Sequence, residues 1–121
     1  MSGTTTDSEN QKKIFSLRDA REVLPVLKQI TDEAVNEVQA QMDSVEKMTD
    51  ENSEFPRIRS AIDSAVNAWA EKVTALGGNP KGLWLVDFDN GEGYYCWRYP
   101  EDVIDHFHSY DQGFSGRSLI C

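Results

Sequence analysis

The chain has few basic residues for the number of its acids. Its 121 residues include 12 Lys and Arg against 21 Asp and Glu, which gives a formal net charge of −9 at pH 7. Nucleic-acid binders neutralise phosphates with Lys and Arg, and proteins of anionic membrane surfaces use polybasic clusters. We therefore expect neither nucleic acid nor a membrane as a partner.

Long hydrophobic runs and cysteine pairs are also missing. No stretch approaches the roughly 18 consecutive apolar residues of a spanning helix, and the polar segment 1–10 lacks the apolar core of a secretory signal. The two cysteines, Cys96 and Cys121, form no CxxC pair and are expected to be reduced thiols. These absences predict a cytoplasmic protein.

The first two thirds of the chain predict helices. Residues 1–13 are polar and without periodicity, and are predicted to be a disordered tail in front of a single domain, 14–121. Over 16–77, apolar residues recur at three- and four-residue steps, which predicts two long helices packed as an antiparallel hairpin. Pro25 removes a backbone donor inside the first helix, so we expect a break or sharp kink there.

Local signals mark the ends of these helices. Ser16 has the side chain of an N-cap residue, and Asp19 places negative charge in the first turn, where it is favourable. Residues 50–54 predict an acidic turn between the helices. Gly77 offers the left-handed cap that ends the second one.

The last third, 82–121, has a different character. Two short runs rich in aromatic residues flank an Asn90-Gly91 pair, which is typical of a β-hairpin. Pro100 ends the second strand, 101–107 is predicted to form a short helix, and a glycine-rich, ordered tail follows. The whole chain therefore predicts an α+β fold, with a helical hairpin packed on a small C-terminal β-hairpin.

The C-terminal residues carry a resemblance to a known family. The motif is Cys96-Trp97-Arg98, Glu101, Ile104, His108 and Asp111-x-Gly-Phe-x-Gly-Arg117, preceded by Phe15-Ser-Leu, Leu24-Pro25 and Leu85-Val-Asp-Phe88. Over residues 14–118 the chain resembles the bacterial domain of unknown function numbered twenty-two-oh-three. It differs in having Pro100 and Phe107 where the family usually has Gly and Trp. The resemblance implies a fold and a motif, and no activity.

Several side chains of this motif can be read as a metal site. Zinc and iron are bound by such residue types, so the candidate ligands are Cys96, Glu101, His108 and Asp111. Their spacing matches no established metal motif, and the sequence favours a structural interpretation instead. In that interpretation Cys96 is a core residue, and a hydrogen-bonded His108–Asp111 pair holds the last loop.

Two further alternatives remain open at the same motif. Cys96 and His108 can form a thiolate–imidazolium pair for catalysis if the thiol is exposed and its pKa is lowered. Arg117, between glycine-rich segments, can bind an anion. The sequence favours instead an ion pair of Arg117 with Glu101 or Asp111 that fixes the tail.

The sequence therefore supports two hypotheses from different functional classes. The favoured one is a non-enzymatic protein-interaction module, in which the acidic helical hairpin binds a protein partner or a second copy of the chain. The alternative is a small metal-binding or thiol-dependent enzyme with its site between Cys96 and Arg117.

Overall fold

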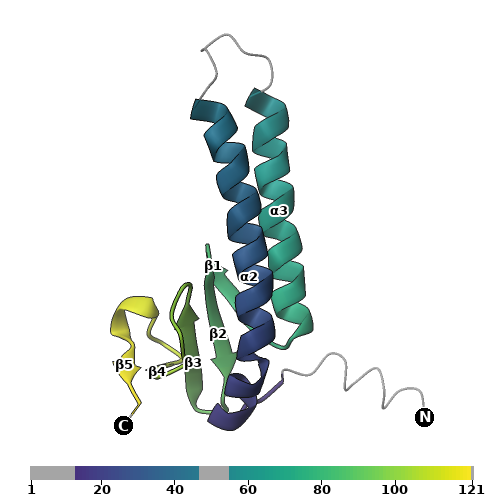
Figure 1. Ribbon diagram of the computed structural model, residues 1–121. Coiled ribbons are helices and arrows are strands. Elements are labelled where there is room, and N and C mark those ends of the chain that lie inside the picture. The colour runs from purple at the N-terminus through teal and green to yellow at the C-terminus, as the bar shows by residue number, and fades with distance from the viewer. Residues whose placement is uncertain (1–12, 47–54, 121) are drawn as a thin grey trace, which may run out of the picture.

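The computed structural model describes residues 13–46 and 55–120. The predicted disordered tail, except for Lys13, lies outside the described residues, as do the predicted turn at 50–54 and Cys121. The described chain is an α+β structure of two helices and a five-stranded antiparallel sheet, which confirms the predicted class (Figure 1).

The first helix, α2, runs from Leu17 to Glu46 without interruption. Ser16 Oγ accepts a hydrogen bond from the amide of Asp19 at 3.0 Å, and Asp19 Oδ2 accepts one from the amide of Ser16 at 3.2 Å. This reciprocal pair is a capping box, so the predicted N-cap is confirmed. The predicted break at Pro25 is wrong, because proline removes only one backbone donor and the helix continues through it. A kink there stays a prediction.

The second helix, α3, covers Phe55–Ala75 and packs antiparallel to α2. Its C-terminal end is capped as predicted by Gly77, whose φ of 98° is a left-handed conformation. The amide of Gly78 donates to the Val73 carbonyl at 3.0 Å, and that of Gly77 to the Thr74 carbonyl at 2.9 Å. These two bonds form a Schellman motif, which returns the chain toward the base of the hairpin.

Five strands follow in sequence order. They are β1 (Asn79–Gly82), β2 (Leu85–Asp89), β3 (Gly93–Arg98), β4 (His106–Ser109) and β5 (Ser118–Leu119), and each pairs antiparallel with the next. The predicted β-hairpin corresponds to β2 and β3. The predicted helix at 101–107 is wrong, because His106 and Phe107 pair with Cys96 and Tyr95 of β3 instead. A 3-10 turn, η1 (Phe114–Gly116), lies in the tail between β4 and β5.

Alternation along the strands gives the sheet two different faces. Val86 and Phe88 of β2 and Trp97 of β3 are fully buried in one cluster with helical residues such as Leu27 and Val73. These side chains form the core between the sheet and the helical hairpin. Asp87 and Cys96, the intervening residues, belong to the opposite face because successive side chains point to opposite sides of a strand.

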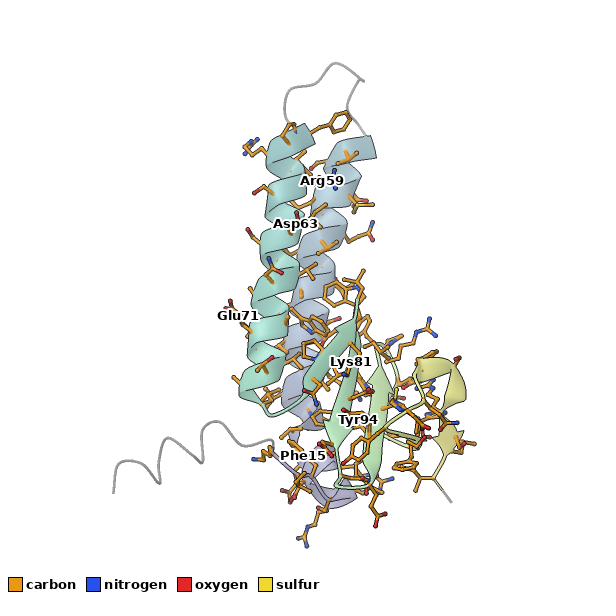
Figure 2. The ribbon with its side chains drawn as sticks, turned by 180° about the vertical axis from the view of Figure 1, so that it is seen from behind. Phe15, Arg59, Asp63, Glu71, Lys81 and Tyr94 are labelled. Atoms are coloured by element: carbon orange, nitrogen blue, oxygen red, sulfur yellow. The ribbon has the colours of Figure 1, made fainter. Side chains whose placement is uncertain are left out.

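The helical hairpin extends well beyond the sheet. In Figure 1 the sheet lies beside one half of the hairpin, and the other half projects past it. Figure 2, viewed from behind, places Arg59 and Asp63 on the projecting half and Glu71 lower, nearer the sheet. Within the described residues, neither helix has the length and apolarity needed to cross a membrane.

Candidate functional site

Three titratable side chains converge on the face of the sheet that points away from the helices. Asp87 on β2 lies directly opposite Cys96 on β3, and His108 on β4 lies opposite Tyr94, which is two residues from Cys96 along β3. All three belong to the same face, because residues paired across a ladder and residues two apart point the same way. The strand register therefore builds the cluster from three neighbouring strands.

The cluster, Asp87–Cys96–His108, is compact and almost fully buried. One carboxylate oxygen, the thiol sulfur and one imidazole nitrogen lie within 4.8 Å of one another. The exposed fraction is 4% for Asp87, 0% for Cys96 and 3% for His108. His108 Nε2 is 3.1 Å from Asp87 Oδ2. These are donor types that bind transition metals, gathered in a buried position.

The hydrogen bonds of His108 define its protonation. Its Nδ1 is 3.0 Å from the carbonyl oxygen of Ser109, which can only accept, so Nδ1 carries a proton. Its Nε2 then faces the carboxylate of Asp87, which also accepts when ionised. Asp87 Oδ1, although buried, has no hydrogen-bond partner among the described residues. With His108 neutral and Asp87 ionised, two acceptors would therefore face each other at 3.1 Å, and a proton or a metal ion between them removes that conflict.

The environment of Cys96 favours the neutral thiol over the thiolate. Burial, and then the negative charge of Asp87, raise the pKa of Cys96 to about 12. Arg117 opposes this only weakly, because its Nη1 is 3.9 Å from Cys96 Sγ. A buried thiol with such a pKa is not a thiolate near neutral pH, so the structure does not favour the thiolate–imidazolium pair.

Two of the four metal ligands proposed from the sequence do not reach the cluster. Glu101 instead forms a bidentate pair with Arg117, with Arg117 Nη2 2.5 Å from Oε2 and Nη1 3.1 Å from Oε1. Asp111 is exposed and accepts a hydrogen bond from Ser109 Oγ at 2.6 Å. The ion pair of Arg117 therefore forms with Glu101, one of the two partners that the sequence offered. The proposed His108–Asp111 pair is wrong, because His108 meets Asp87 instead.

The Glu101–Arg117 pair joins the tail to the end of β3. Desolvation opposes ionisation of Glu101, but hydrogen bonds from Arg117 and from the Arg98 amide outweigh it and lower the pKa of the carboxyl group. Glu101 also accepts a hydrogen bond at its carbonyl oxygen from Trp97 Nε1, at 2.8 Å. The Phe114 ring lies beneath the guanidinium of Arg117 at 4.1 Å. These contacts link Trp97, the Arg98 backbone, Glu101 and Arg117 to one another at the end of β3.

Sequence reasoning missed Asp87. The residue occurs in the Leu85-Val-Asp-Phe88 segment of the family resemblance, but an acid in a strand gave no reason to select it. The signal that could have found it is the Asn-Gly turn, because the hairpin register places Asp87 opposite Cys96.

A cavity of about 320 Å³ lies beside the cluster. Asp87 and His108 form part of its wall, together with Tyr94, Tyr110 and Lys81. Residues Gly113 and Phe114 of the tail also line it. The cavity therefore leaves room for water or a small ligand next to two of the three cluster residues.

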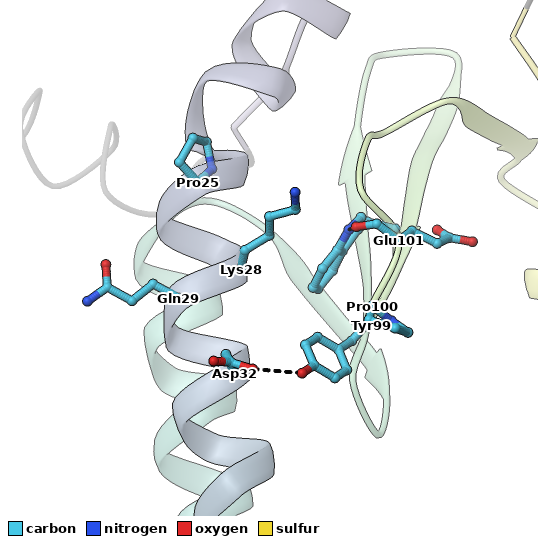
Figure 3. Close-up of a pocket in the computed structure, with 8 residues that line it drawn as sticks. Pro25, Lys28, Gln29, Asp32, Tyr99, Pro100 and Glu101 are labelled. Carbon is cyan, nitrogen blue, oxygen red and sulfur yellow. Dashed lines mark hydrogen bonds between the residues drawn. The ribbon is translucent and has the colours of Figure 1, made fainter.

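A second cavity, of about 360 Å³, lies between α2 and the end of β3 (Figure 3). Pro25, Lys28 and Asp32 line its helical side, and Tyr99 and Pro100 line its sheet side. Tyr99 Oη donates to Asp32 Oδ1 at 2.8 Å across the gap. This contact holds the sheet against the hairpin. Among the described residues, the walls of this cavity bring together no group of three metal-binding side chains.

The fold and the site together define an α+β protein with a helical hairpin on one face of its sheet and a buried Asp–Cys–His cluster on the other. The chain belongs to the DUF2203 family, described as an uncharacterized conserved protein, whose sequence pattern matches residues 13–120. This match confirms the resemblance. No curated protein and no solved structure matches the chain.

Proposed function

We propose that this chain is a non-enzymatic, cytoplasmic interaction module that associates with a second copy of itself through the projecting half of its helical hairpin. The supporting observation is that this half has little core of its own. In the described stretch 32–45 of α2, no residue is fully buried. On α3, Ile58 is the one fully buried residue within 55–68.

Apolar side chains on the projecting half are only partly covered. Val35, Val38 and Val45 on α2 are half-buried, as are Ile62 and Val66 on α3. Met42, beside them on α2, is 46% exposed. Two helices alone cannot enclose such a stripe, whereas two hairpins packed together form a four-helix bundle that does. A second copy is the simplest partner, since an isologous interface presents the same apolar stripe from both sides.

The charges of the projecting half also suit self-association. Glu37 and Asp43 make α2 acidic in this region, whereas α3 carries Arg57 and Arg59 together with one acid, Asp63. Pairing α2 of one copy with α3 of another brings opposite charges to the rim of the interface. Such rim charges set orientation and association rate more than affinity.

The non-enzymatic part of the proposal is supported by the chemistry of Cys96. A nucleophilic cysteine needs an exposed thiol with a lowered pKa, and the thiol here is buried with a raised pKa. We therefore set aside the thiol-dependent enzyme as a function of this chain.

The test is the mass of the purified full chain in solution, measured by sedimentation equilibrium over a range of concentrations. We expect a dimer, and we expect Met42→Glu to convert it to a monomer because the change puts a charge into the interface. Ala40→Glu is the matched control, since residue 40 is exposed two positions away on the same helix.

Far-ultraviolet circular dichroism of both variants shows whether the helices persist. A wild-type chain that stays monomeric at all concentrations overturns the proposal. Equal dissociation of both variants would also overturn it, because the effect would then not depend on the apolar stripe.

A further inference from the structure

We propose that Asp87, Cys96 and His108 together bind one divalent transition-metal ion of the zinc class, on the tail-facing side of the sheet. This inference is independent of the proposed self-association, because the cluster and the projecting hairpin lie in different parts of the fold.

The donor set fits such an ion. Zinc accepts thiolate sulfur, imidazole nitrogen and carboxylate oxygen, and a soft sulfur next to a nitrogen disfavours Mg²⁺ and Ca²⁺. Tetrahedral zinc, with ligand distances of about 2.0–2.3 Å, places neighbouring donor atoms roughly 3.5 Å apart. His108 Nε2 and Asp87 Oδ2 are already 3.1 Å apart, and the whole cluster lies within 4.8 Å. Small side-chain rotations are enough to close the set around an ion.

An unpartnered carboxylate oxygen is the second observation that supports a ligand. Asp87 is 4% exposed, and its Oδ1 has no hydrogen-bond partner in the part of the chain that the structure describes. A buried polar atom without a partner is unfavourable by about 1–3 kcal/mol and calls for a specific reason. A metal ion between Asp87, Cys96 and His108 supplies that partner.

The orientation of His108 is that of a metal ligand. Its Nδ1 donates to the carbonyl oxygen of Ser109, the residue that follows it on β4, which fixes the ring and directs Nε2 at Asp87, where a metal ion can take the place of a shared proton. Metal-binding histidines usually donate their other ring nitrogen to a carbonyl or a carboxylate in this manner. The same arrangement, without a cation, leaves two acceptors facing each other across 3.1 Å.

The fourth ligand has room to bind. The cavity of about 320 Å³ is bounded by Asp87 and His108, so a water molecule can complete a tetrahedral site from that side. On binding, the Cys96 thiol releases its proton to solvent and coordinates as a thiolate. Any proton shared between Asp87 and His108 leaves as well, so the bound ion replaces these protons as the local positive charge.

The experiment is a titration of the untagged full chain, prepared with chelator and then freed of it, with Zn²⁺ and separately with Co²⁺. Isothermal titration calorimetry should give one Zn²⁺ per chain. The Co²⁺ form should show the ligand-field bands of a tetrahedral ion and a near-ultraviolet thiolate-to-cobalt charge-transfer band. The thermal unfolding temperature should rise with metal concentration, because only the folded chain holds the three ligands together.

Matched variants locate the ion. Asp87→Asn, Cys96→Ser and His108→Gln should each weaken Zn²⁺ binding by at least roughly 100-fold, beyond the loss seen when an outer-shell partner is removed. Asp111→Asn and His106→Gln are the controls for the carboxylate and the imidazole. Asp111 is exposed on the tail, and His106 faces Cys96 across the β3–β4 ladder but is not in the cluster. Neither control should change the affinity or the spectrum.

Several outcomes would overturn the proposal. One is a wild-type chain that binds neither ion with one-to-one stoichiometry. A Co²⁺ complex without the charge-transfer band is another, and it needs no variant, so misfolding of a variant cannot hide it. Unchanged Zn²⁺ affinity in Cys96→Ser would also be decisive, with circular dichroism confirming that the variant is folded. Monomeric protein that binds zinc would leave this site intact and overturn only the self-association.

Discussion

The two faces of the sheet bury side chains of different chemistry. On the face toward the helices, Val86, Phe88 and Trp97 are fully buried among apolar side chains. On the face toward the tail, Asp87 and Cys96 of the same two strands are equally buried, but among polar groups. Alternate residues of one short hairpin thus belong to a dry core and to a polar cluster.

The difference shows how a small chain can place a polar cluster directly behind an apolar core. The helix-facing side derives its stability from the area it removes from water, which is non-directional and tolerant of detail. The tail-facing side depends on individual hydrogen bonds and ion pairs, each worth little after desolvation. Substitutions on the first face should therefore unfold the protein, and those on the second should alter local chemistry.

The largest effect is expected from the neighbouring residues 96 and 97. Both side chains are 0% exposed, but Trp97 lies in the helix-facing core and Cys96 in the polar cluster. Trp97→Ala should lower the free energy of unfolding by about 3–5 kcal/mol, because it leaves a large cavity. Cys96→Ala should lower it by about 1 kcal/mol, because few atoms are removed. Urea denaturation followed by circular dichroism measures both values.

The proposed difference in stability between the two faces would be contradicted if Cys96→Ala proved as destabilising as Trp97→Ala. That result would show that the polar cluster contributes as much to the free energy of unfolding as the apolar core does.

A smaller effect is expected at the ion pair that fixes the tail. Arg117→Ala removes the bidentate contact with Glu101, in which both side chains are mostly buried. We expect a loss of about 1–2 kcal/mol, between the values for exposed and buried pairs. Hydrogen exchange should quicken in the tail from Gly113 to Ile120 and stay unchanged around Trp69 and Val73. Faster exchange in the helices as well would show that the tail is part of the global unfolding unit.

The same pair should make stability depend on pH. The lowered pKa of Glu101 means that the folded state favours the ionised carboxyl group. The contribution is therefore complete above the unfolded pKa of a glutamate, and it is lost as pH falls through the lower folded value. Glu101→Gln should be less stable than the wild type at neutral pH, and the difference should narrow in acid. A constant difference down to acidic pH would exclude the ion pair as its cause.

Much of the helix-facing side could be predicted from the sequence. Three- and four-residue apolar spacing defined both helices, and Ser16 and Gly77 marked ends that the structure confirms. The Asn90-Gly91 pair identified the β2–β3 hairpin. These signals are local, and local patterns are what propensity and periodicity report. The error at Pro25 shows the limit, since the packing of α2 on α3 and the sheet overrides one lost backbone bond.

The tail-facing side could be predicted only in part. The Arg117–Glu101 pair was among the sequence-based expectations, and Cys96 and His108 were both candidates. Asp87 was missed although the hairpin register places it opposite Cys96. The structure places Glu101 and Asp111 outside the cluster, because which side chains meet there also depends on the pairing of β4 with β3. The strand β4 was hidden for the same reason. His106-Phe107-His108 is too short to indicate a strand until β3 lies beside it.

The smallest effect on stability is expected from two tyrosines that donate hydrogen bonds to carboxylates on opposite sides of the sheet. They allow the helix-facing and tail-facing sides to be compared through single hydrogen bonds. Tyr99 bonds Asp32 of α2 at 2.8 Å, and Tyr110 of the tail bonds Asp89 at 2.6 Å. Tyr99→Phe should lower the free energy of unfolding by only about 0.5 kcal/mol, because the bond is exposed to water. Tyr110→Phe should instead quicken hydrogen exchange in the tail alone.

Both bonds should also weaken in alkali. The hydrogen bond to Asp32 raises the pKa of Tyr99, and the bond to Asp89 raises the pKa of Tyr110 to about 12. A raised pKa stabilises the folded state below the unfolded value near 10, and the contribution is lost as pH rises through the folded value. Ultraviolet titration of each Tyr→Phe variant assigns the remaining late-ionising tyrosine. If Tyr110→Phe altered exchange on the helix-facing side as much as Tyr99→Phe does, the two faces would be coupled through the sheet, and a change in the tail-facing cluster would also affect the helical hairpin.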